Sequence, residues 1–249
     1  MSSREWDGKT YDRISAPMEQ MGLAVLDRLP LTGDETVLDA GCGSGRVTEA
    51  LIERLPNGRV IGVDGSAAMI AAARERLGPA VDLRVQDLLA LDVEPVDAIL
   101  STATFHWIKD HDALFRRLYG VLRPGGRLVA QCGGEGQAAA VHAAAEEVGA
   151  REPYASSFAG WVGPWHFADA ESTERRLRAA GFTQARAWLQ VVPMETPDGE
   201  EWLRTIMLGT HLERLPADLR DGFVGEVGAI LGVDPLRLDY VRLNIDAAR

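Results

Sequence analysis

The chain has 249 residues, a length that fits one large domain or one domain with an inserted subdomain. It carries 37 acidic and 26 basic residues, a net charge of −11, so we expect no nucleic-acid partner, because phosphate backbones repel an acidic surface. Hydrophobic residues make up 46% and charged residues 25%, as in ordinary globular proteins. No stretch has the apolar length of a signal peptide or a membrane span, so we expect a cytoplasmic protein with no membrane partner.

Strand-like and helix-like segments alternate along the first half of the chain. Residues 11–29 predict a helix that Pro30 ends. A second predicted helix, 112–122, is expected to end at the turn Pro124-Gly125-Gly126. The alternation predicts parallel strands joined by crossover helices. The expected strands are 37–38, 59–64, 83–87, 96–101 and 127–132.

The second half departs from this alternation, and its long connections predict insertions that carry function. We therefore expect an α/β fold: a doubly wound, mostly parallel seven-stranded sheet with helical cap insertions after strands 5 and 6. Strand 7 is expected to be antiparallel, and both insertions to rise from the edge where strands 1 and 5 end. The single domain 1–249 is expected to comprise a core at 30–132, cap segments 133–170 and 194–236, and closing strands 184–192 and 238–245.

A glycine-rich loop is the most informative local pattern. Gly41-Cys42-Gly43-Ser44-Gly45 follows an apolar run that ends in Asp39, and it precedes a helical pattern from Arg46. A strand, a tight loop and a helix N-terminus in this order form a nucleotide-sized site at the carboxyl edge of a sheet. A dinucleotide fingerprint would require glycine at position 46, so Arg46 disfavours NAD as the ligand.

Two acidic residues stand at the ends of successive predicted strands. Asp64 ends strand 2, where one carboxylate can accept hydrogen bonds from both hydroxyls of a ribose. The alternative is that Asp64 caps the following helix, a role that Ser66 could fill alone. Asp87 ends strand 3, with a turn residue as the alternative.

Together, the segments from 36 to 132 resemble the core of the class I S-adenosylmethionine-dependent methyltransferases. The resemblance is carried by Val37 to Gly45, Val63-Asp64-Gly65-Ser66 with Met69-Ile70, Gln86-Asp87, and Leu122-Arg123-Pro124-Gly125-Gly126. It implies a Rossmann-like methyltransferase fold, S-adenosyl-L-methionine as cofactor and S-adenosyl-L-homocysteine as product. We expect no metal, because two cysteines and five scattered histidines give no zinc-binding pattern. In this family Asp39 would orient the methionine end of the cofactor, and Asp87 would accept from the adenine amino group. The implied cofactor-binding residues are Asp39, Gly41, Gly43, Gly45, Asp64, Gly65, Met69, Asp87, Leu88 and Ser101.

The segment after strand 4 narrows the resemblance. Phe105-His106-Trp107-Ile108, followed by Asp110-His111 and Leu114-Phe115, is similar to the trans-aconitate methyltransferase-like branch, which esterifies a carboxylate of a small acid. In that branch a tryptophan and its neighbours after strand 4 face the substrate. The resemblance therefore implies a small-molecule acceptor and carboxyl O-methylation of a small organic acid.

His106 is the catalytic candidate, because it stands just past strand 4 at the ligand edge. It could act as a base or as a hydrogen-bond donor to the substrate, and the alternative is a loop histidine stacked beside Trp107. An ionised carboxylate needs no base near neutral pH, whereas a phenol, amine or alcohol would profit from one. The candidate substrate-binding residues are Tyr11, Trp107, Trp165, His166 and Arg204, with Arg242 on strand 7 as a second cation for a carboxylate.

Two rival functions remain open at this point. One is O-, N- or C-methylation of a natural-product-like metabolite in an aromatic pocket, where Trp161, Trp165 and Phe167 would form walls rather than lid core. The other is a protein that binds S-adenosylmethionine without transferring methyl.

The two cysteines, Cys42 and Cys132, would end strands about 9.6 Å apart, too far for a disulfide.

Overall fold

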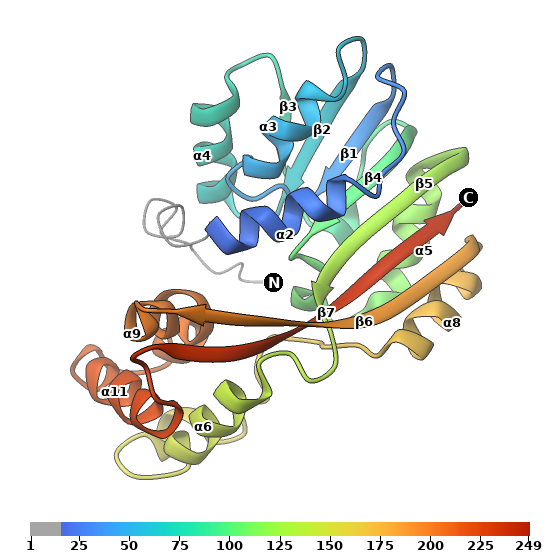
Figure 1. Ribbon diagram of the computed structural model, residues 1–249. Helices are drawn as coiled ribbons and strands as arrows, with labels where there is room; N and C mark the ends of the chain where they lie inside the picture. The colour runs from blue at the N-terminus through green and yellow to red at the C-terminus, as the bar shows by residue number, and fades with distance from the viewer. Residues whose placement is uncertain (1–15) are drawn as a thin grey trace. The chain divides into compact units, whose positions relative to one another are not determined.

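The computed structural model describes residues 16–249, which form a seven-stranded sheet with the order β3-β2-β1-β4-β5-β7-β6 (Figure 1). β1 to β5 run parallel to one another, and β7 pairs antiparallel with β5 from Arg127↔Ala248 to Gly133↔Arg242. The predicted mostly parallel sheet with an antiparallel last strand is therefore confirmed. The strands are β1 (Thr36–Ala40), β2 (Arg59–Asp64), β3 (Asp82–Val85), β4 (Val96–Thr102), β5 (Leu122–Gly133), β6 (Thr183–Thr196) and β7 (Leu236–Ala248).

The helices of the first half connect the parallel strands, and those of the second half are mostly short. The predicted helix 11–29 is observed as α2 from Ala16 to Leu26; residues 1–15, with the candidate Tyr11, lie outside the described residues. The other α-helices are α3 (Arg46–Glu53), α4 (Ala67–Leu77), α5 (His111–Val121), α6 (Ala139–Gly149), α7 (Ala155–Phe158), α8 (Ala170–Ala180), α9 (Gly199–Trp202), α10 (Gly209–Leu212) and α11 (Arg220–Leu231). The 3₁₀ helices are η1 (Leu88–Ala90), η2 (Phe105–Trp107) and η4 (Ala217–Leu219), and η3 (Leu203–Met207) is a π-helix.

The boundary predicted at Pro124-Gly125-Gly126 is wrong. The Pro124-Gly125-Gly126 turn does not separate helix from strand, because β5 begins at Leu122, directly after α5. The reason is a pair of backbone hydrogen bonds: the Gly125 amide donates to the Arg249 carbonyl (2.8 Å), and the Arg249 amide donates to the Gly126 carbonyl (3.0 Å). These bonds join the turn to the end of β7 and so extend the sheet.

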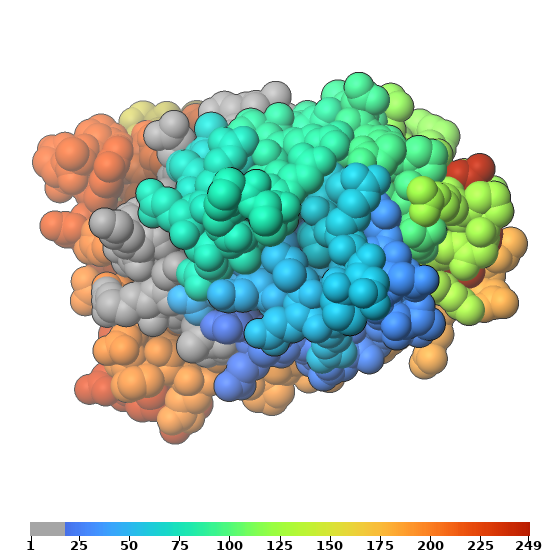
Figure 2. All heavy atoms as spheres, turned by 90° about the horizontal axis from the view of Figure 1, so that it is seen from above, coloured from blue at the N-terminus to red at the C-terminus, as the bar shows by residue number. Residues whose placement is uncertain are grey.

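The chain divides into two compact units, of which the first contains the sheet's parallel part. Of the described residues, it comprises 16–135, 166–189 and 242–249. All five residues of β1 are buried, as expected for a strand covered on both faces. One apolar cluster joins the sheet to α5 and α8, and a second joins it to α2 and α3, which makes the first unit doubly wound. In Figure 2, the blue-to-teal part of the chain, which includes α3 and α4, forms much of the visible surface.

The second unit comprises residues 136–165 and 190–241, so the ends of β6 and β7 belong to it. It falls largely within the two expected cap segments. Its core is rich in rings: Phe158 packs on Phe223 with centroids 5.4 Å apart, and Trp161 packs on His211 at 4.7 Å. Among residues 16–249, no helix combines the length and the apolarity needed to cross a membrane.

Candidate functional site

The loop after β1 has the backbone geometry of a ligand cradle. Gly41, Gly43 and Gly45 adopt φ values of 88°, 55° and 85°, a region that side chains disfavour. A Cβ on Gly41 would lie 2.1 Å from the hydroxyl oxygen of Thr104, so glycine is required where the two segments meet. A Cβ on Gly43 would meet no described atom within 4 Å, and the same holds for Gly65. Open space therefore lies against Gly43 and Gly65, where a ligand can approach the backbone.

Asp39 lies beneath this loop and has one oxygen directed at no described partner. The side chain is only 1% exposed, and the Thr48 hydroxyl donates to its Oδ2 at 2.7 Å. Oδ1 is buried and has no hydrogen-bond partner in the described part of the chain. Burial raises the pKa of Asp39 to about 7, against the hydrogen bond from Thr48 and with help from the negative charge of Asp64. A buried acceptor of this kind fits a bound ammonium group, such as that of the cofactor's methionine end.

Asp64 is positioned by the loop itself. The Gly43 amide donates to its Oδ2 (3.0 Å) and the Ser66 amide to its Oδ1 (2.8 Å), which leaves further lone pairs on both oxygens. Burial raises the pKa of Asp64, and the two amide hydrogen bonds oppose this change. Ser66 caps α4 by accepting from the Met69 amide, so the capping role that the sequence left open for Asp64 belongs to Ser66.

The other implied cofactor residues surround the same edge of the sheet. Asp87 is exposed and caps η1 by accepting from the Leu89 amide at 2.9 Å, while Met69 and Leu88 are buried. The Ser101 hydroxyl donates to the Ala40 carbonyl at 2.6 Å and so joins β4 to β1. An open cradle, an unsatisfied buried carboxylate oxygen and two acids at strand ends suit S-adenosylmethionine, although the contacts of each residue with the cofactor remain predictions.

His106 lies where β4 turns into η2. Ala103, with φ 53°, makes the turn in a left-handed conformation that is unusual for alanine, and Thr104 then packs on Gly41. The Gly133 amide donates to His106 Nδ1 at 3.3 Å. Since an amide can only donate, Nδ1 accepts, and the neutral imidazole carries its proton on Nε2. Burial, followed by the positive charge of Arg242, lowers the pKa of His106 to about 3. His106 is thus a neutral hydrogen-bond donor.

The sequence reasoning missed a buried polar network beside His106. The Arg242 Nε donates to Gln131 Oε1 (3.3 Å), the Gln131 amide group donates to Asn244 Oδ1 (2.8 Å), and Arg28 donates to that same Oδ1 (2.5 Å). Gln131 and Asn244 are directly opposite each other on β5 and β7. The sequence hints at this network, because polar residues occupy the alternate positions 242 and 244 of a core strand. Their partner on β5 depends on the strand register, which the sequence does not reveal.

Two further candidates lie next to His106 in the first unit. The His166 amide donates to the His106 carbonyl at 2.8 Å, and its ring packs edge-on against His111 with centroids 4.5 Å apart. The Trp107 ring centroid is 5.1 Å from that of His106. The structure therefore brings His106, Trp107 and His166 together, and their contacts with substrate remain predictions.

The remaining candidates, Trp165 and Arg204, belong to the second unit. Trp165 packs edge-on against Trp161 (5.8 Å) and His142 (5.0 Å). Arg204 forms ion pairs with Asp221 (2.8 Å) and Glu200 (3.7 Å). Both therefore have structural roles within their own unit, and their contacts with substrate stay predictions.

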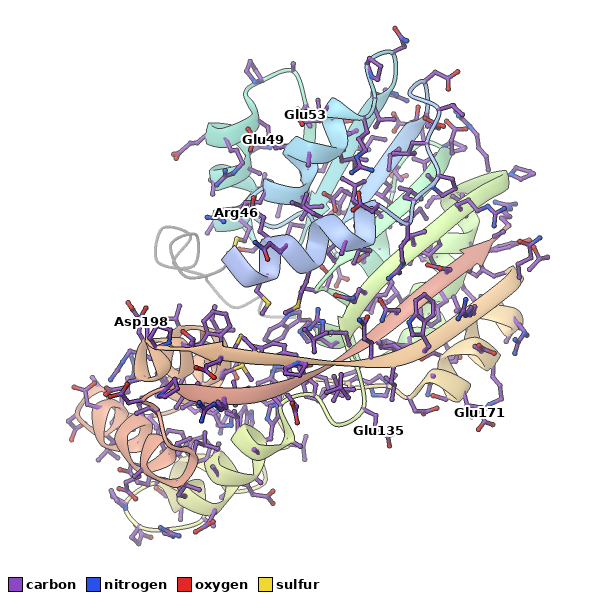
Figure 3. The ribbon with its side chains drawn as sticks, viewed as in Figure 1. Arg46, Glu49, Glu53, Glu135, Glu171 and Asp198 are labelled. Atoms are coloured by element: carbon purple, nitrogen blue, oxygen red, sulfur yellow. The ribbon has the colours of Figure 1, made fainter. Side chains whose placement is uncertain are left out.

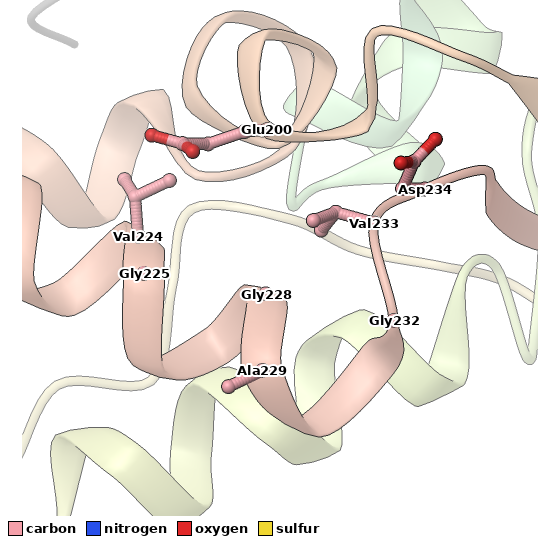
Figure 4. A pocket seen from close by; sticks show the side chains of 8 residues that line it. All are labelled: Glu200, Val224, Gly225, Gly228, Ala229, Gly232, Val233 and Asp234. Carbon is pink, nitrogen blue, oxygen red and sulfur yellow. The ribbon is translucent and has the colours of Figure 1, made fainter.

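A pocket of about 450 Å³ also lies in the second unit, between α9 and α11 (Figure 4). Glycine and other small residues form most of its wall, and Glu200 and Asp234 are the two acidic residues that line it. Two carboxylates repel an anionic substrate, so this pocket does not suit an organic acid.

Arg46, the residue that disfavours a dinucleotide, has a structural role. It begins α3, along which Glu49 and Glu53 follow (Figure 3). Its guanidinium forms a 2.6 Å ion pair with Glu19 of α2. Dinucleotide-binding proteins have a small residue at this position, whereas here the Arg46 side chain connects α3 to α2.

Comparison with known proteins agrees with the geometry. A family described as a methyltransferase domain matches residues 37–126. A trans-aconitate 2-methyltransferase from Variovorax paradoxus is 31% identical over 252 residues, which cover 96% of this chain and 94% of that protein. Phosphoethanolamine N-methyltransferase 2 from Haemonchus contortus, solved with S-adenosyl-L-methionine, has a TM-score of 0.62 at 22% identity and covers 97% of this chain and 56% of that one. The cyclase SpnF has a TM-score of 0.56 at 20% identity, covering 93% of this chain and 80% of that one.

The two solved structures are too dissimilar in sequence to show more than the fold, whereas the Variovorax relative matches almost the whole chain. S-adenosylmethionine as the cofactor agrees with these matches, with the open space at Gly43 and with the buried Asp39 oxygen that has no hydrogen-bond partner among the described residues. The chain therefore belongs to the class I S-adenosylmethionine-dependent methyltransferases and resembles their trans-aconitate methyltransferase branch.

Proposed function

We propose that this enzyme methylates a carboxylate oxygen of a small organic acid. The observation that carries the proposal is the state of His106, whose Nδ1 accepts from Gly133 and whose pKa is lowered to about 3. Such a histidine does not accept a proton near neutral pH, so it does not serve as a base for a phenol, alcohol or ammonium group. It can donate a hydrogen bond from Nε2, which suits an acceptor that is already anionic.

The chemistry of a carboxylate acceptor matches a site without a base. When bound, the cofactor supplies an electrophilic methyl group on a positively charged sulfur. A carboxylate oxygen forms the new bond to carbon as the sulfur–carbon bond breaks, and the electron pair of that bond remains on sulfur. The products are a methyl ester and a neutral thioether, and no proton has to be removed.

The residues of the first unit would then act by holding the acid rather than by proton transfer. His106 Nε2 donates to the carboxylate and orients it, and the hydrogen bond from Gly133 holds the ring in place. Thr104, which packs on Gly41, connects the histidine segment to the cofactor loop and so limits the distance between the reacting groups. The trans-aconitate substrate named for the relative is a small organic acid and supports the same class of acceptor.

The pH dependence of methyl transfer tests the proposal. With an acid that the enzyme methylates, kcat should stay constant from about pH 6.5 to 8.5, because neither the acid nor His106 titrates there. A kcat that rises tenfold per pH unit through this range would contradict the proposal, since it would show a base or an acceptor that must lose a proton. Transfer to phenols or amines and to no acid would support the rival natural-product methylation instead.

A further inference from the structure

A buried histidine, His111, binds the backbone of the His106 segment in the first unit. It is the first residue of α5 and is only 2% exposed. Its Nε2 lies 3.0 Å from the carbonyl oxygen of Phe105, the residue before His106. Since a carbonyl only accepts, Nε2 donates, and the neutral ring carries its proton there. Burial lowers the pKa of His111 to about 4, so the ring is neutral near pH 7.

The next carbonyl of the same segment is bound as well. The His166 amide donates to the His106 carbonyl at 2.8 Å, and the His166 ring packs edge-on against the His111 ring with centroids 4.5 Å apart. Two successive carbonyls of η2, those of Phe105 and His106, therefore accept hydrogen bonds from two residues that contact each other. This arrangement limits how far the backbone of His106 can move.

The other ring nitrogen of His111 makes the residue costly for stability. Nδ1 is buried and has no hydrogen-bond partner among the described residues. A buried acceptor without a partner destabilises a fold, whereas a phenyl ring of similar shape would not. The Phe105 carbonyl does not need the histidine for its own pairing, because the Ile108 amide also donates to it at 3.0 Å. Stability alone therefore favours an apolar ring at position 111.

We infer that His111 is a positioning residue, which fixes the η2 backbone so that the Nε2–H group of His106 is directed at the methyl acceptor. This inference rests on the proposed function, in which His106 donates to that acceptor. The hydrogen bond from Gly133 to the His106 ring is long, at 3.3 Å, so the direction of Nε2 also depends on where η2 is held. A displacement of about 1 Å in a group that orients a substrate can cost about a hundredfold in rate.

A double-mutant cycle tests whether His111 acts through His106. With an acid acceptor and a tritiated methyl group, His111→Phe should lower kcat roughly tenfold, because the donor is misplaced. In the His106→Ala background the same change should alter kcat by less than about twofold, since no donor is left to position. His111→Gln, whose side-chain amide can donate to the Phe105 carbonyl, should restore most of the parent rate.

Thermal melts separate positioning from a structural role. His111→Phe should melt at or above the temperature of the parent, because it removes the unpaired Nδ1. Phe115→Leu is the matched control: the Phe115 ring packs against His111 (5.5 Å) and Phe105 (6.1 Å) but has no donor. It should melt at a lower temperature and keep kcat within about twofold.

Three outcomes of these measurements would overturn the inference. One is a kcat of His111→Phe equal to that of the parent, and another is an equal loss of kcat in the parent and His106→Ala backgrounds. The third is a His111→Phe protein that melts below the parent or does not fold, since His111 would then have a structural role.

Nitrogen-15 NMR of histidine-labelled protein separates failure of this inference from failure of the proposed function. If the enzyme methylates no acid, the proposed function is wrong, and the ring spectra then decide the role of His111. In the parent, His106 and His111 should both carry the proton on Nε2. In His111→Phe the two ring nitrogens of His106 should shift towards each other, because a ring no longer held at Gly133 exchanges between tautomers, whereas in His111→Gln they should stay distinct. An unchanged His106 spectrum in His111→Phe, or a proton on Nδ1 of His111 in the parent, would overturn the inference even if acids are methylated.

Discussion

Cofactor affinity should depend on pH through Asp39. In the cofactor-free protein burial raises the pKa of this carboxyl group to about 7, so at pH 6 most molecules carry a proton there. The predicted partner of Asp39 is the ammonium group of the cofactor, which requires the ionised form. Below pH 7 the proton must leave before the ion pair can form, and each pKa unit corresponds to a factor of ten. Affinity should therefore fall about tenfold at pH 6 and about a hundredfold at pH 5, relative to pH 8.

Isothermal titration with S-adenosylhomocysteine between pH 5 and pH 8 measures this dependence, and titrations at pH 6 in two buffers of different ionisation enthalpy count the released proton. Asp39→Asn should bind weakly at every pH, with no slope. Thr48→Val should move the midpoint to higher pH, because the Thr48 hydroxyl opposes the rise in the Asp39 pKa. Asp82→Asn, at an exposed acid paired with Arg84, should behave as the parent does. An affinity that is constant from pH 5 to pH 8, with no proton released, would refute the reasoning.

The remaining predictions concern the loop, the ribose acid and the histidine. Gly43→Ala should abolish S-adenosylhomocysteine binding, because its methyl group enters the open cradle. The control Gly125→Ala, at a glycine that also has positive φ and open surroundings, should lose about 1 kcal/mol of stability in a denaturant melt and bind the ligand normally. Equal ligand affinities of the two variants would show that Gly43 does not line the cofactor site. Asp64→Ala should weaken that binding about tenfold by calorimetry, the effect of lost hydrogen bonds to an ordered acceptor, and unchanged affinity would exclude it. His106→Ala should lower kcat about 10- to 100-fold, whereas His106→Gln, which keeps a hydrogen-bond donor, should lower it less. An equal loss of kcat in both variants, with a changed dependence of kcat on pH, would identify His106 as a base.

The parts of the site that a local pattern defines could be predicted from the sequence. The strand ending in Asp39 and the loop to Gly45 depend on residues close in the chain, and the structure confirms the strand, the tight glycine loop and the helix that follows. The antiparallel last strand was also predicted correctly from the fold class.

The rest depends on pairings between distant segments. Gln131 and Asn244 are opposite each other only in the observed register of β5 and β7, and one shifted residue would point them to opposite faces. The protonation state of His106 depends on the Gly133 amide, which lies beyond a strand and a helix from it. The turn at Gly125 was assigned to the end of a helix because its hydrogen-bond partner is Arg249, at the far end of the chain.

The most direct test of the account is the chemical stability of the product. The enzyme is incubated with S-adenosylmethionine labelled in its methyl group and a panel of small acids, phenols and amines, and each labelled product is then treated with mild base. We predict that label is transferred to small organic acids and that base releases it as volatile methanol, as it does from a methyl ester. Label that stays bound to the product after base treatment, as in an N-, C- or ether O-methyl group, would contradict the account.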